Sequence, residues 1–268
     1  MRRRITSCVW MLGLLAAGSA FAADSNKHHL QCAYDSDYDV QVRPDGLAFT
    51  RSEGHPARVF MHDGQLRIDG HTVMVSADDA VRLRAYEQQV RELVPAMTAI
   101  ARDGVDIGYA ALSTVVATLS DNSADRARML QTLHERRDEA MHEVDSTFGQ
   151  GLWSAGDDSQ LFGEDLAKTV AELVGGLAGN AVSDALSGDS SRVAALEARV
   201  NALDTTLDKA VQEPAEKLGQ RVEALCPRLS ALDQLQQQFH FRLSDGGTLQ
   251  LLFLDMDSTY KASHYAQR

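Results

Sequence analysis

The stretch Gln65–Val90, QLRIDGHTVMVSADDAVRLRAYEQQV, changes its hydrophobic period at Ser76. Before this residue, apolar and polar side chains alternate, which is typical of a strand with one buried face. After it, apolar residues recur three and four positions apart, as they do on one face of a helix. Ser76 is a good N-cap residue, and Asp79 three positions later completes a capping box. The stretch therefore predicts that a β-sheet ends and a helix begins at residue 76.

A small antiparallel β-meander is predicted over residues 23–75. Alternation begins at Tyr38, and turn sequences rich in Pro, Asp and Gly separate the candidate strands. Asp69-Gly70 is a preferred dipeptide for a two-residue hairpin turn. That turn places Leu66 opposite Val73, so one face of the hairpin is apolar.

Residues 76–238 are predicted to form long helices. The first helix carries a stripe of large side chains, namely Leu83, Tyr86, Val90, Leu93, Met97 and Ile100. We expect Pro95 to kink this helix or end it, and Asp103-Gly104 to break it. Helical patterns continue over 105–119, 125–148 and 160–186, with a glycine-bearing loop at 149–156 that buries Trp153.

A coiled-coil-like pattern begins at Val193 and has apolar residues three and four positions apart. Its members are Val193, Leu196, Val200, Leu203, Leu207 and Ala210. Pro214 is expected to interrupt it, and a shifted apolar phase follows. Three heptads with few charged flanking pairs favour a helical hairpin within one chain over a long fibre.

The C-terminal segment 239–257 is predicted to be a second β-hairpin. Two alternating apolar runs flank a turn at Ser244–Gly247, and the hairpin is expected to complete the N-terminal sheet. Residues 258–268 are expected to be a loose tail. The fold class is therefore α+β and mostly α, with long helices beside a small antiparallel meander.

Residues 1–22 have the pattern of a signal peptide. Three arginines precede an apolar run at Val9–Ala17, and Ala20-Phe21-Ala22 offers small residues at the cleavage site. The run is too short for a permanent membrane span. The sequence thus predicts an exported protein that is released from the membrane.

Removal of the leader changes both the charge and the cysteine count. The whole chain carries 26 Lys and Arg against 38 Asp and Glu, and the leader holds three of the arginines. The mature net charge is then about −15, which disfavours nucleic acid as a partner. Cys8 leaves with the leader, so Cys32 and Cys226 remain as an even pair in an oxidising compartment. We predict a disulfide between them; the alternative is two unrelated buried thiols.

Small residues recur every four positions in the helix predicted over 160–186. They are Ala171, Gly175, Gly179, Ser183 and Ser187. Glycine inside a helix is unfavourable, so close approach of a neighbouring helix is the expected compensation. Reversible membrane contact through this face is the alternative interpretation, although Glu172 argues against a spanning helix.

The richest polar cluster lies in the helix predicted over 125–148. His134, Asp138 and His142 are spaced four apart and share one helix face. A zinc protease of the HExxH type would need histidine where Asp138 stands. We expect this face to be solvated, with ion pairs between successive helix turns. The alternative is a metal site. The sequence predicts no cofactor and no catalytic residue.

The chain resembles the YggN-like family of exported bacterial proteins, whose function is unknown. The resemblance rests on the leader, on the two cysteines and on three stretches of sequence. These stretches are Gly64–Gly70 (GQLRIDG), Tyr86–Pro95 (YEQQVRELVP) and Ile100–Val105 (IARDGV). It implies a location in the periplasm of a Gram-negative cell, and it transfers no site residues.

These features predict a non-enzymatic interaction protein of the periplasm, chaperone-like or an envelope scaffold, with a protein partner in the envelope. One alternative is an envelope protein that associates reversibly with a membrane through the helix segment 171–187. A second alternative is a metal-dependent enzyme that uses His134, Asp138 and His142. The sequence does not indicate an oligomeric state.

Overall fold

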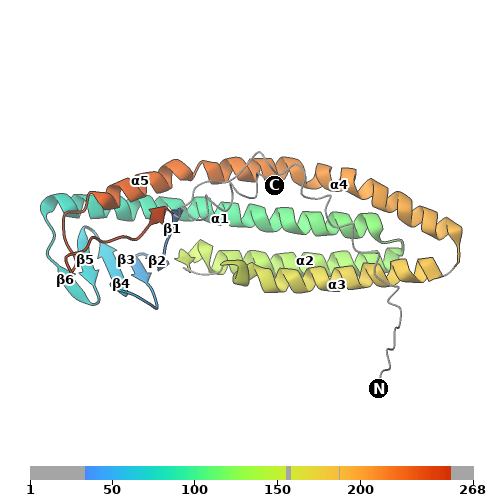
Figure 1. Cartoon of the computed structure of the whole chain (residues 1–268), viewed down its shortest axis with the longest axis horizontal. Helices are drawn as coiled ribbons and strands as arrows, with labels where there is room; N and C mark the ends of the chain where they lie inside the picture. Colours follow the sequence, from blue (N-terminus) through green and yellow to red (C-terminus); the bar gives the residue numbers. More distant parts are fainter. Residues whose placement is uncertain (1–33, 155–157, 187, 255–268) are drawn as a thin grey trace, which may run out of the picture.

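The computed structural model describes residues 34–154, 158–186 and 188–254, with a β-sheet at one end and long helices extending from it (Figure 1). Helix α1 starts beside the sheet and runs along the helical arm. Helices α4 and α5 lie on one side of it, and α2 and α3 lie on the other. The predicted α+β, mostly helical fold is confirmed.

The sheet has six antiparallel strands in the order β6-β5-β4-β3-β2-β7. Five of them are consecutive: β2 (Asp39–Arg43), β3 (Gly46–Thr50), β4 (Arg58–His62), β5 (Gln65–Ile68) and β6 (His71–Val73). Leu66 lies opposite Val73, so the predicted register of the last hairpin is confirmed. Asp69 and Gly70 have φ angles of 48° and 86°, the left-handed backbone that a tight two-residue hairpin turn uses.

The sixth strand comes from within the predicted helical region. Strand β7 (Leu152–Trp153) follows a short 3-10 helix, η2 (Phe148–Gln150), and pairs with β2 at the sheet edge. The Val42 N–H donates to the Gly151 carbonyl at 2.8 Å and extends this contact. The segment predicted as a loop therefore contains a strand, which two residues are too few to reveal by periodicity.

Helix α1 (Ala77–Leu119) is continuous over 43 residues. Ser76 caps it by accepting the Asp79 N–H at 3.0 Å, as predicted. Of the two outcomes predicted at Pro95, a kink or an end, the end is wrong, and so is the predicted break at Asp103-Gly104. The low helix propensity of proline and glycine is outweighed here, because different neighbours pack against the two halves of α1.

Three ion pairs tie the region of the expected break to α2 (Ser123–Ser146) and α4 (Ser190–Glu223). They are Arg102–Asp145, Asp103–Arg221 and Asp106–Arg137. Each is at least partly exposed, so each contributes about 1 kcal/mol or less to stability. They hold charged residues of α1 against α2 and α4 near Asp103-Gly104, where the sequence alone predicts a break.

The larger hydrophobic core lies between the sheet, α1 and α5 (Cys226–Gln237). The α1 stripe contributes Leu83, Tyr86, Val90 and Leu93, all nearly inaccessible to solvent as predicted. The sheet contributes Leu47, Phe49, Val59, Met61 and Leu66. Gly64, with φ of 77°, lies so close to α1 that a Cβ atom there would clash with the Ala80 carbonyl. A glycine is therefore required at this contact.

A smaller core joins α1 and α2 to α3 (Asp158–Leu186). Its buried members are Tyr109, Val116, Leu133 and Leu173. Helix α4 contributes no buried residue, and of the coiled-coil positions Val193 and Val200 are 44% and 51% exposed. Pro214 lies inside α4 without interrupting it, so that prediction is also wrong.

The C-terminal segment needs correction in its pairing. The expected turn is present, because the Gly246 N–H donates to the Leu243 carbonyl at 2.9 Å. Burial alternates through Phe239 and Phe241 as it would in a strand. The described strand of this segment, β8 (Phe253–Leu254), pairs with β1 (Tyr34–Asp35) in a separate two-stranded sheet. The expected hairpin therefore does not complete the main sheet.

Side chains replace a strand partner in this segment. Buried Asp79 accepts the His240 N–H at 3.1 Å. The Gln236 side-chain oxygen accepts the N–H groups of Leu251 and Leu252 at 3.0 and 3.1 Å. Because buried backbone groups must be hydrogen-bonded, these two side chains fix the segment against α1 and α5.

Candidate functional site

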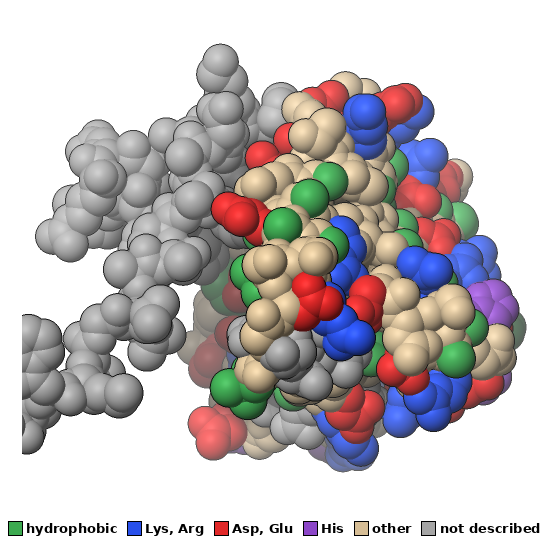
Figure 2. All heavy atoms as spheres, turned by 90° about the vertical axis from the view of Figure 1, so that its right-hand side faces the viewer, with side chains coloured by type: hydrophobic (Ala, Val, Ile, Leu, Met, Phe, Trp, Pro, Cys, Tyr) green, Lys and Arg blue, Asp and Glu red, His purple; other side chains and the backbone are tan. Residues whose placement is uncertain are grey.

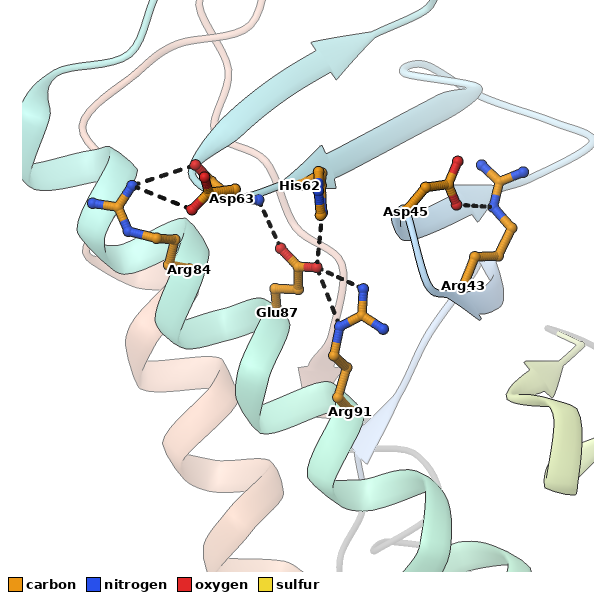
Figure 3. Close-up of polar contacts among 7 residues, drawn as sticks. All are labelled: Arg43, Asp45, His62, Asp63, Arg84, Glu87 and Arg91. Carbon is orange, nitrogen blue, oxygen red and sulfur yellow. Dashed lines mark hydrogen bonds and ion pairs between the residues drawn. The ribbon is translucent and has the colours of Figure 1, made fainter.

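A polar cluster joins the turn between β4 and β5 to α1 (Figure 3). Its centre is Glu87, which is 8% exposed. The Glu87 carboxylate accepts from Arg91 Nη2 at 2.7 Å and from the Asp63 N–H at 2.9 Å. His62 Nδ1 lies 3.3 Å from the same carboxylate. Arg84 reaches the Asp63 carbonyl from the preceding turn of the helix.

The electrostatics of this cluster favour an ionised Glu87. Burial of the carboxyl opposes ionisation, but hydrogen bonds from Arg91, from the Asp63 N–H and from His62 outweigh burial. Together they hold the pKa of Glu87 below its ordinary value. Both carboxylate oxygens already accept from protein groups, so the carboxylate is engaged in holding the turn. We interpret the cluster as a structural clasp rather than a catalytic centre.

Sequence reasoning missed this clasp. The spacing of Glu87 and Arg91, four apart on a helix, was a signal for an ion pair. No pattern linked them to His62, since that contact depends on how the sheet packs against α1.

The predicted polar face of α2 is exposed. His134 Nε2 lies 3.5 Å from Asp138 Oδ2, and their side chains are 64% and 59% accessible. His142 is also exposed on this helix. No group of three or more His, Cys, Asp or Glu side chains in the described ranges is placed to hold a metal ion. The structure thus brings His134 and Asp138 together as an exposed pair between successive helix turns.

The small-residue stripe of α3 faces away from the neighbouring helices. Ala171, Gly175 and Gly179 are exposed, and a Cβ atom at either glycine would meet nothing within 4 Å. The side chain of Ser183 and the whole of Ser187 lie outside the described residues. The expected packing of this stripe inside the bundle is therefore wrong for its three described members.

A different face of α3 makes the contact with α2. Thr169 and Leu173 are buried, and a Cβ atom at Gly176 would lie 2.9 Å from Met129 Cε. The stripe was misplaced because α3 is rich in small and apolar residues on more than one face. Periodicity alone did not say which face turns inward.

The outward side of α3 also carries large apolar side chains. Val170, Val174, Val182 and Leu186 are 37%, 58%, 57% and 81% exposed. Residues four apart are neighbours on the helix surface, and because each step of four turns about 40° around the axis, the row winds around the exposed side of α3 next to the stripe. We call these four residues, together with Ala171, Gly175 and Gly179, the outer face of α3. Within the described residues, no helix combines the length and the apolarity needed to span a bilayer.

Residues 32–252 match a family model described as Protein of unknown function (DUF2884). The chain belongs to this family. The match extends over the main sheet and helices α1 to α5, so the DUF2884 assignment covers the polar clasp and the outer face of α3 alike. No curated protein and no solved structure matches the chain.

The clasp predicts a pH-dependent stability. Glu87→Gln removes the charge but keeps the shape, and we expect it to lower the free energy of unfolding by about 1–3 kcal/mol at pH 7. Because the pKa of Glu87 is lowered by folding, its contribution is present above the unfolded value of about 4.3 and is lost as the pH falls. Urea unfolding from pH 7 to pH 3 should therefore show the difference closing.

Glu92→Gln is the matched control, since Glu92 lies on the same helix but is 55% exposed. It should change stability little at any pH. A destabilisation by Glu87→Gln that is equal at pH 7 and pH 3 would contradict the role given to the charge.

Proposed function

We propose that this protein is exported to the periplasm and acts there without catalysis, binding another protein of the cell envelope as a chaperone-like or scaffold protein. The observation that carries the proposal is the outer face of α3. Its valines and leucine stand in one row on the surface rather than singly, and contiguous apolar patches on soluble proteins commonly mark interaction sites.

The surroundings of the outer face fit a protein interface. Exposed Lys168 and Glu172 lie three residues before Ala171 and Gly175, so they give the outer face a polar border on the side of the small-residue stripe. Each square ångström of apolar surface covered by a partner contributes roughly 25 cal/mol. Covering the row would therefore be favourable.

Charge favours a protein partner over a nucleic acid or an anionic membrane. The chain has a net charge of −12, and about −15 without the proposed leader. At the end of the helical arm, acidic, basic and hydrophobic side chains are interspersed (Figure 2). This surface offers no broad basic area to phosphate groups. Contact of the outer face with uncharged lipid is the alternative.

The resemblance to the YggN-like family supports export, and one shared cavity supports the proposed disulfide. Cys32 lies outside the described residues, but Tyr34 two positions later lines the same cavity as Leu225, which precedes Cys226. A Cys32–Cys226 bond would close a loop of nearly 200 residues. The loop-entropy model gives it about 5 kcal/mol of stabilisation.

The outer face predicts a specific effect of charge on binding. A photo-crosslinking amino acid at Gly179 should give discrete heavier adducts with an envelope protein in living cells. Adding Val174→Glu should abolish them, because a buried unpaired carboxylate is unfavourable. Val81→Glu is the matched control, since Val81 on α1 is also 58% exposed, and it should leave the adducts unchanged.

Three results would contradict this function. One is the absence of adducts at position 179, and another is equal loss in the Val81→Glu control. The third is Val174-dependent co-sedimentation of the protein with phosphatidylcholine vesicles in place of protein adducts, which would establish the membrane alternative.

Export and the disulfide predict a measurable change in the purified protein. Protein isolated after expression with its leader should begin at residue 23, and it should migrate faster on a non-reducing gel than after reduction. An intact leader would contradict export. Equal mobility, with both remaining thiols open to alkylation, would contradict the disulfide.

A further inference from the structure

The face of the sheet that is turned away from the larger core carries two exposed arginines beside one phenylalanine. Alternation along β4 places Arg58 and Phe60 on this face, because Val59 and Met61 are buried in the core. Arg67 of β5 lies directly opposite Phe60 and is exposed. We call Arg58, Phe60 and Arg67 the arginine face of the sheet.

Neighbouring residues hold the phenylalanine ring in place. Gly46 of β3 leaves room for the ring, since a Cβ atom there would lie 2.6 Å from Phe60 Cζ. The guanidinium carbon of Arg43 lies 5.5 Å from the ring centroid, in a cation–π contact. Arg43 Nε also lies 3.4 Å from the Asp45 carboxylate (Figure 3). The charge of this third arginine is therefore already paired.

Arg58 and Arg67 differ from the other arginines of the protein. Within residues 34–154, 158–186 and 188–254, the guanidinium group of every other arginine contacts a carboxylate or a backbone carbonyl. The guanidinium groups of Arg58 and Arg67 make no such contact with these residues. Asp69 is close to Arg58, but its carboxylate accepts the backbone N–H of Arg58, at 2.8 Å. Two positive charges on this face are thus unpaired.

The two unpaired charges are near each other. Because Phe60 pairs with Arg67, Arg58 is the diagonal neighbour of Arg67, and such neighbours are about 7–8 Å apart. Like charges at this separation repel, and a ligand with two carboxylates would relieve the repulsion. Arginine binds carboxylates well, through two parallel hydrogen bonds. On a chain with a net charge of −12, this pair is a local site for an acidic partner.

We propose that the arginine face binds an extended acidic segment of a partner protein, with acidic residues two positions apart. In an extended chain, side chains two positions apart point to the same side and are about 6.6 Å apart, close to the separation of Arg58 and Arg67. Phe60 offers a half-buried apolar surface beside them. An anionic membrane fits less well, because the net negative charge of the protein opposes its approach.

This site lies on the sheet and not on the outer face of α3, so it goes beyond the proposed function. Its failure would leave that function untouched. Val174→Glu on α3 should accordingly leave binding at the arginine face unchanged. A loss of acidic-peptide binding in this variant would overturn the separation of the two sites.

Fluorescence anisotropy with labelled peptides tests the charge and the spacing. At low ionic strength, the peptide ETETETET should bind the purified protein saturably, and added salt should weaken binding. The uncharged peptide QTQTQTQT should not bind. EETTEETT has the composition of ETETETET but no two glutamates two positions apart, so it should bind roughly 2- to 5-fold more weakly. Absence of saturable binding of ETETETET would overturn the proposal, and equal affinity for EETTEETT would overturn the spacing.

Variants locate the binding on the sheet. Arg58→Ser combined with Arg67→Ser should weaken binding of ETETETET by about 5- to 25-fold. Both side chains are exposed, so we expect the fold to be kept, which circular dichroism checks. Arg128→Ser with Arg192→Ser is the matched control, since it changes the net charge equally and these side chains are 79% and 60% exposed. Equal loss in the control, or undiminished binding to the folded sheet variant, would overturn the site.

Vesicles distinguish the class of partner. The protein should not co-sediment with phosphatidylglycerol vesicles at the ionic strength that permits binding of ETETETET. Co-sedimentation that is lost in the variant with Arg58→Ser and Arg67→Ser would overturn the choice of a protein segment, because it would assign the arginine face to an anionic lipid.

Discussion

The structure depends on one continuous helix that packs into two separate hydrophobic cores. The first half of α1 supplies Leu83, Tyr86, Val90 and Leu93 to the core beneath the sheet. The second half supplies Tyr109 and Val116 to the core shared with α2 and α3. Because both cores include the same helix, the sheet and the helical arm are joined by a rod rather than by a linker.

This constraint explains where sequence reasoning succeeded and where it failed. The Leu66–Val73 register and the Ser76 cap were predictable, because turn and cap chemistry act over a few residues. Neither Pro95 nor Pro214 ends its helix, so the end considered at Pro95 and the interruption predicted at Pro214 were wrong for a tertiary reason. A proline removes one hydrogen bond of the helix, and packing along the long neighbouring helices offsets that loss.

The candidate sites were harder to predict, since each depends on contacts between distant segments. His62 meets Glu87 only because the turn between β4 and β5 rests on α1. The spacing of Gly175 and Gly179 predicted close packing against another helix, but it did not reveal that this face turns outward. Trp153 joins the sheet through a two-residue strand that carries no periodic signal.

The polar clusters and the exposed apolar surface of the molecule have different roles. Buried carboxylates such as Asp79 and Glu87 accept hydrogen bonds from segments distant in sequence, so they position the sheet and the C-terminal segment against α1. The outer face of α3, in contrast, carries exposed apolar side chains. The proposed binding of an envelope protein therefore uses this apolar surface, and the buried polar clusters hold the fold.

Amide hydrogen exchange along α1 tests the central claim most directly. If one helix carries both cores, backbone amides from residue 81 to residue 119 should be protected, including those that follow Pro95 and Asp103-Gly104. The free energies of opening should not fall to near zero between the two cores. Rapid exchange confined to residues 96–106, with protection on both sides, would contradict the account, because it would divide α1 into two helices joined by a hinge.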